Sequence, residues 1–90
     1  MHIAREKAKL LARVRRIRGQ VEAIERALEA ERGCADILHL VAAARGATNG
    51  LMAELIEDHV REHVLNEEHS KAERDAAADE LVDVVRAYLK

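Results

Sequence analysis

Apolar side chains recur at alternating steps of four and three residues along the first third of the chain. This spacing is typical of one face of a helix that packs against other helices. It predicts a helix from about Ile3 to about Glu31, with Gly33 as its C-terminal stop. The stripe consists of Leu10, Val14, Ile17, Val21, Ile24 and Leu28.

The spacing continues beyond Gly33 and predicts a second helix from about Cys34 to about Leu65. Its stripe consists of Ile37, Val41, Ala44, Thr48, Leu51 and Leu55. A short polar connection, residues 66–69, follows. Ser70 and Glu73 then have the spacing of a capping box, which predicts a third helix that runs to the end of the chain.

With 90 residues, no proline and one aromatic residue, the composition is that of an all-α protein. Three helices joined by short connections are too few to close a core, because the hairpin of the first two needs two more helices against its seam. We therefore expect residues 1–90 to form one domain that pairs with a second copy as an antiparallel dimeric four-helix bundle. A chain this short also gains core by association.

The charge is strongly asymmetric. Residues 1–18 carry seven basic and one acidic side chain, whereas the rest of the chain carries eight basic and sixteen acidic ones. A basic helix on an acidic body indicates a local face that binds a polyanion such as nucleic acid. The alternative is a solvated cationic helix that pairs with the acidic part of another subunit.

Other features limit the function classes. One cysteine cannot form a disulfide within its chain, and no signal peptide or membrane-spanning run is visible, so we expect a cytoplasmic protein without a membrane partner. No P-loop, dinucleotide-binding fingerprint or paired carboxylate site is present. A Cys/His nucleophile would lack an oxyanion hole, so an enzyme is not expected.

His59 and His63 are four residues apart on the second predicted helix, close enough to share a metal ion. Such a pair also arises by chance, and a lone cysteine such as Cys34 is often a small buried hydrophobe. Cys34 and His59 are separated by roughly 37 Å at 1.5 Å rise per residue, so a common site requires two antiparallel chains. His2 and the amine of Met1 add two nitrogens. His39 and His69 are expected to be ordinary surface or interface histidines.

Thr48 and Asn49 are polar residues in the slim middle of the second predicted helix. If they are buried, they need hydrogen-bond partners and become candidates for a specificity or switching network. The simpler alternative is that Asn49 faces solvent.

Three stretches together resemble the CsoR/RcnR/FrmR family of bacterial transcriptional repressors. They are residues 13–21 (RVRRIRGQV), 43–54 (AARGATNGLMAE) and 85–90 (VRAYLK), with Cys34, His59 and His63 between them. The resemblance spans almost the whole chain. It implies antiparallel hairpins that form a dimer and then a disc-shaped tetramer. It also implies release of operator DNA when an effector binds between subunits.

The effector implied by the resemblance depends on the donor atoms. Met1, His2, Cys34, His59 and His63 match the register of the nickel- and cobalt-sensing branch. Copper sensors have a second cysteine where this chain has His63. Formaldehyde sensors use an N-terminal proline amine with the same cysteine; His2 departs from that pattern, although the long motifs resemble this branch most closely.

The resemblance places DNA contacts on Arg13, Arg16 and Arg45, and the charge pattern independently favours the first two. The sequence therefore predicts a Ni(II)- or Co(II)-responsive repressor of an efflux or detoxification operon, with Zn(II) as a further ligand in vitro. The alternatives are a formaldehyde-responsive repressor that uses Cys34 and the N-terminal amine, and a metal-buffering helical bundle without a DNA role.

Overall fold

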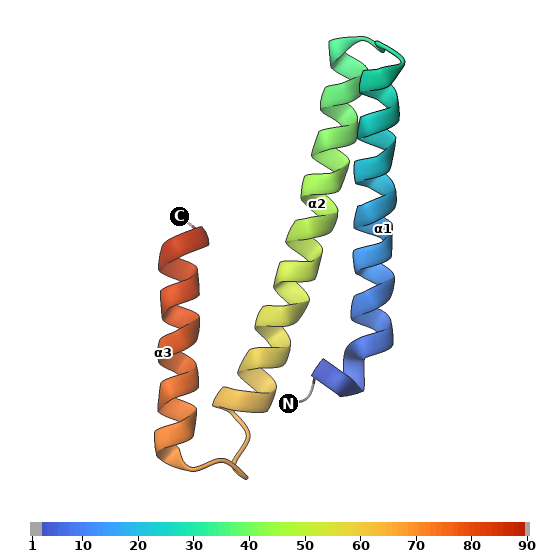
Figure 1. The fold of residues 1–90 in the computed structure, drawn as a ribbon. Helices are drawn as coiled ribbons and strands as arrows, with labels where there is room; N and C mark the ends of the chain where they lie inside the picture. Colours follow the sequence, from blue (N-terminus) through green and yellow to red (C-terminus); the bar gives the residue numbers. More distant parts are fainter. Residues whose placement is uncertain (1–2, 90) are drawn as a thin grey trace. The chain divides into compact units, whose positions relative to one another are not determined.

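The computed structural model describes the backbone of residues 3–89 and the side chains of residues 6–89. Its elements are α1 (Ile3–Glu29), α2 (Cys34–His59), the π-helical turn η1 (Val60–Val64) and α3 (Lys71–Tyr88) (Figure 1). No strand occurs among these residues, which confirms the all-α prediction. None of the described helices combines the length and apolarity that crossing a membrane requires. The chain divides into two compact units, one of residues 5–52 and one made mainly of residues 53–89.

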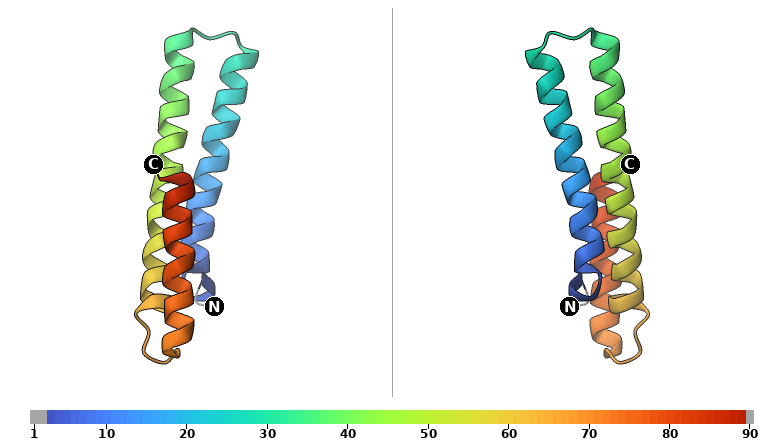
Figure 2. Two further views of the ribbon diagram at one scale, coloured as in Figure 1. Left: turned by 90° about the vertical axis from the view of Figure 1, so that its left-hand side faces the viewer. Right: turned by 90° about the vertical axis from the view of Figure 1, so that its right-hand side faces the viewer.

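In the first unit, α1 and the first part of α2 run side by side in opposite directions (Figures 1 and 2). The turn between them begins two residues earlier than predicted. Arg32 donates its backbone N–H to the carbonyl of Ala27, and Glu31 donates its own to the carbonyl of Leu28. These two hydrogen bonds define a Schellman motif. Glu31 therefore takes the left-handed conformation, with φ 53°, and the predicted stop at Gly33 is wrong.

The inner face of α1 is rotated from the predicted stripe. Leu10 and Ala27 are buried, with 7% and 3% of their surface exposed. Three members of the predicted stripe are instead exposed within the protomer, by 45%, 53% and 57%: Val14, Val21 and Leu28. Arg13 and Gln20, each next to one of these positions, are half-buried. The prediction therefore found the helix but misplaced half of the face that packs within the chain.

The same rotation occurs on α2. Ile37 and Ala44 of the predicted stripe are half-buried, but Val41 and Thr48 are exposed, and Leu40 and Ala47 lie inward instead. An apolar stripe that is wider than one helix contact leaves its outer half for another helix. The hairpin therefore exposes valine and leucine side chains along this face of the protomer.

The second unit contains the end of α2, η1, the connection and α3, which packs against η1. The α-helix predicted to reach Leu65 ends at His59, because Leu65 donates its N–H to the carbonyl of Val60, five residues back, at 2.9 Å. The predicted start of the third helix is confirmed: Ser70 accepts from the backbone N–H of Glu73, and the Glu73 carboxylate accepts from that of Ser70. α3 ends at Tyr88, short of the chain end that was predicted.

Candidate effector site and DNA-binding face

Two histidines meet at the junction of α2 and η1. The ring centroids of His59 and His63 are 5.3 Å apart, and the rings are tilted by 45°. The helical spacing of the sequence predicted this proximity. His59 is the last residue of α2, and His63 lies within the π-helical turn η1, a kind of turn that is frequent at functional sites.

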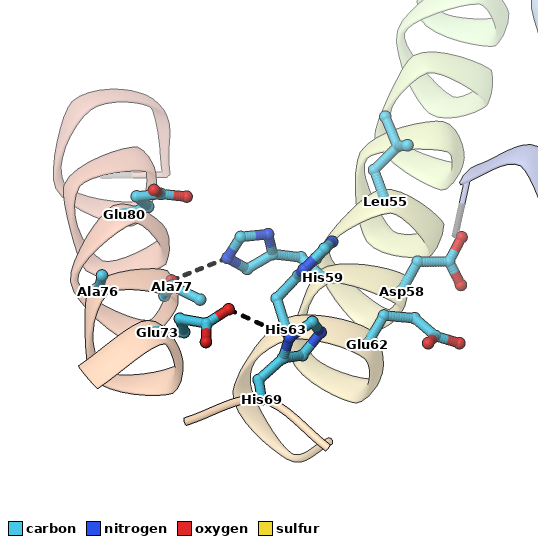
Figure 3. A pocket seen from close by; sticks show the side chains of 10 residues that line it. All are labelled: Leu55, Asp58, His59, Glu62, His63, His69, Glu73, Ala76, Ala77 and Glu80. Carbon is cyan, nitrogen blue, oxygen red and sulfur yellow. Dashed lines mark hydrogen bonds and ion pairs between the residues drawn. The ribbon is translucent and has the colours of Figure 1, made fainter. Parts of the chain in front are cut away.

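His59 is oriented by α3. Its Nε2 lies 2.8 Å from the backbone carbonyl oxygen of Ala77, one of the few buried residues of the described chain (Figure 3). A carbonyl oxygen can only accept a hydrogen bond, so Nε2 carries the proton. In the neutral ring, Nδ1 then holds the lone pair that can bind a metal. A backbone carbonyl that fixes the tautomer in this way is a common partner of metal-binding histidines.

A third histidine belongs to the same cluster. His69 stacks on His63 with ring centroids 5.8 Å apart and an angle of 26° between the ring planes. Its Nδ1 lies 3.4 Å from the carboxylate of Glu73, and its Nε2 is buried without a hydrogen-bond partner among the described residues. The sequence predicted an ordinary surface or interface histidine at this position; in the protomer His69 is half-buried and belongs to the histidine cluster.

Glu73 joins this cluster to the helix cap. The pKa of Glu73 is lowered mainly by hydrogen bonding with the side chain of Ser70 and, to a smaller extent, with the backbone of Ser70. The nearby His69 lowers the pKa further. The carboxylate is consequently held in its charged form while it caps α3 and faces His69. One residue thus connects the start of α3 to the histidines.

The three histidines line an open pocket whose other polar side chains are acidic. These are Asp58, Glu62, Glu73 and Glu80 (Figure 3). Negative charge around imidazole donors favours a cation over an anion. No three His, Cys, Asp or Glu side chains of the described part of the chain are close enough to hold a metal together. Within the described residues of one protomer, His59 and His63 are therefore a pair of possible donors and not a complete metal site.

The other predicted donors are Cys34, Met1 and His2. Cys34 is the first residue of α2, exposed and with a free thiol, whereas His59 is the last residue of that helix. Because Cys34 and His59 lie at opposite ends of one helix, a metal site that contains both of them requires a second chain. Met1 and His2 lie outside the described residues.

The predicted DNA-contacting arginines belong to the hairpin. Arg16 and Arg45 are exposed, whereas Arg13 is half-buried on the inner face of α1. Thr48 and Asn49 are exposed too, and the Thr48 hydroxyl donates to the Ala44 carbonyl of its own helix at 2.8 Å. Within the protomer this pair therefore forms no buried polar network.

Residues 6–87 match the family model described as a metal-sensitive transcriptional repressor. The chain belongs to this family. Its members are transcriptional repressors and not enzymes, and a repressor acts by binding operator DNA.

Individual relatives cover nearly the whole chain. The chain is 49% identical over 99% of its length to an uncharacterized protein in the bioA 5′ region of Serratia marcescens, and 40% identical over 99% to the transcriptional repressor RcnR of Salmonella paratyphi B. Both alignments cover 98% of the relative. A solved variant of the formaldehyde-responsive regulator FrmR from Salmonella enterica serovar Typhimurium superposes with a TM-score of 0.88. That comparison has 46% identity and covers 98% of this chain and 99% of the other.

Proposed function

We propose that this protein represses an efflux or detoxification operon and releases its operator when Ni(II) or Co(II) binds between subunits. The observation that carries the proposal is the pairing of His59 and His63 at 5.3 Å, with the proton of His59 held on Nε2 by Ala77. Two imidazoles and one thiolate are donors that suit late first-row metals, including Zn(II). The similarity to RcnR supports this branch of the family.

The donor set is completed by two protomers. Cys34 of one protomer joins His59 and His63 of its partner, together with the N-terminal amine of Met1 and His2. The exposed apolar face of the hairpin supports association into a dimer and then a tetramer, because an interface would remove Val14, Val21 and Leu28 from water. A site shared between chains makes metal binding depend on how the chains pack.

DNA release follows from this connection. The N-terminal donors directly precede the helix that carries Arg13 and Arg16 in the chain, so metal binding tethers the segment with the basic residues. The basic faces of the tetramer then no longer match the spacing of the phosphates. Contacts of this kind depend on phosphate charge and DNA shape, without a helix inserted in the groove.

An operator-binding assay tests the proposal directly. Purified protein is titrated onto a labelled fragment from upstream of its own gene, and Ni(II), Co(II), Zn(II), Cu(I) and formaldehyde are then added separately. We expect Ni(II) or Co(II) to release the DNA at the lowest concentration. Release by Cu(I) alone, or no binding of the fragment at all, contradicts the proposal.

A formaldehyde-responsive repressor is the second candidate, and the 46% identity to the FrmR variant favours it. In this case the Cys34 thiolate adds to the aldehyde carbon, and the N-terminal amine then displaces water to leave one bridging carbon. Formaldehyde would release the DNA and add 12 Da per bridge, the mass of one carbon, as measured by intact-mass spectrometry. A metal buffer without a DNA role is disfavoured by membership of a repressor family.

A further inference from the structure

Arg13 reaches from α1 to α2 at Gly50. A methyl group on Gly50 would lie 3.0 Å from Nη1 of Arg13 and 4.0 Å from its Cζ, and the first of these distances is too short for an ordinary contact. Gly46, one helical turn earlier, has no such neighbour within 4 Å. The guanidinium of Arg13 therefore occupies the space that a side chain at position 50 would fill.

The rotated face of α1 explains this position. Arg13 lies on the half-buried side of the helix, on the same face as Leu10 and Ile17, and its side chain reaches α2 at Gly50. Arg16 is exposed on the same helix. The two α1 arginines proposed to contact DNA thus differ: Arg13 rests against the neighbouring helix, whereas Arg16 is exposed.

We infer that Gly50 is a positioning residue for DNA binding, because its missing side chain lets the guanidinium of Arg13 rest on α2 in a defined orientation. This inference rests on the proposed contact between Arg13 and operator DNA. A guanidinium that is already oriented loses less side-chain entropy when it binds a phosphate oxygen. A methyl group at position 50 displaces the tip of a flexible side chain and leaves the backbone in place, so its effect falls on the arginine.

Gly46 provides a matched control. Gly50→Ala and Gly46→Ala each remove a glycine from the same helix and improve helix propensity to the same degree. We expect both variants to keep the fold and to melt at or above the wild-type temperature. Any difference between the two variants in DNA affinity then comes from the contact of the added methyl group with Arg13, which only the Gly50 variant makes.

The experiment measures operator affinity by fluorescence anisotropy for wild type, Gly46→Ala, Gly50→Ala, Arg13→Ala and the double variant Gly50→Ala/Arg13→Ala. We expect Gly50→Ala to weaken binding by about fivefold, because the guanidinium tip must move off its contact with α2 and loses its defined orientation. Gly46→Ala should stay within about twofold of wild type. The double variant should bind no more weakly than Arg13→Ala, since the glycine acts through the arginine.

The outcomes separate this inference from the proposed function. If wild type binds and Arg13→Ala weakens binding, but Gly50→Ala equals Gly46→Ala, the role of Gly50 is overturned and the repressor function stands. Equal losses of affinity from Gly50→Ala with and without Arg13 overturn it as well. If wild type does not bind the fragment, both fail. A changed NMR signal of the Arg13 Nε–H group in free Gly50→Ala, absent in Gly46→Ala, is a second expected result.

Discussion

His59 donates the proton of Nε2 to the backbone carbonyl oxygen of Ala77 at 2.8 Å, and so a candidate effector ligand is bonded to α3. The bond fixes both the ring orientation and the tautomer. Any effector that binds Nδ1 therefore acts on a ring that is already attached to the C-terminal helix.

Replacing His59 separates its structural bond from its ligand role. His59→Ala should lower the free energy of unfolding by about 1 kcal/mol, the usual net contribution of a hydrogen bond. His59→Gln, whose amide can still donate to Ala77, should recover part of that stability and yet lose the metal response. Chemical denaturation and metal titration measure the two effects, with the exposed His39→Ala as a control. If His59→Gln keeps full metal affinity, His59 is not a ligand.

Cys34→Ala should leave operator affinity nearly unchanged and abolish release of DNA by metal. The thiol is exposed at the first residue of α2, so its loss removes a donor atom without opening a core cavity. Anisotropy titrations with and without Ni(II) measure both properties. Continued release by metal would place the site away from Cys34.

His69 should support His63 through their stacked rings. His69→Ala removes the stack and the contact with Glu73, and we expect it to weaken metal affinity about tenfold, as loss of a group that orients a ligand does. His69→Phe keeps a ring and should restore most of the affinity. Isothermal titration calorimetry measures the series; equal losses from both substitutions would show that the ring stack contributes nothing.

The Glu73 cap should give a defined acid dependence. Its pKa is lowered in the folded protein, so the folded state binds fewer protons and gains stability above the ordinary glutamate pKa of about 4.3. This contribution is lost as the pH falls from that value through the lower folded pKa. Urea unfolding should show a difference between wild type and Glu73→Gln that is constant at neutral pH and shrinks below about pH 4. A difference that grows on acidification would mean that folding raises the pKa of Glu73, which contradicts the prediction.

Operator affinity should fall steeply with salt, because the proposed contacts are to phosphates. Arg16→Ala should weaken binding to all sequences alike and reduce the slope of log affinity against log salt by about one, the effect of removing one phosphate-binding side chain. Asp83→Ala, an exposed substitution on α3, serves as a control. An unchanged slope in Arg16→Ala would remove Arg16 from the DNA interface.

The sequence alone determined the features that depend on local geometry. Apolar spacing and the absence of proline predicted three helices, and the capping box at Ser70 is present as predicted. The pairing of His59 with His63 also follows from helical spacing, because residues four apart on a helix are neighbours.

Only the tertiary structure decided which face of each helix packs inward and which side chains meet across the connections, because several arrangements fit the same apolar periodicity. The wide apolar stripe of α1 could face α2 through Val14 or Arg13, and packing turned Arg13 inward over Gly50. The π-helical turn contains no glycine or proline from which it could have been predicted. His69 follows a connection whose path only the packing of α3 fixes, and so its stack on His63 could not be inferred from spacing.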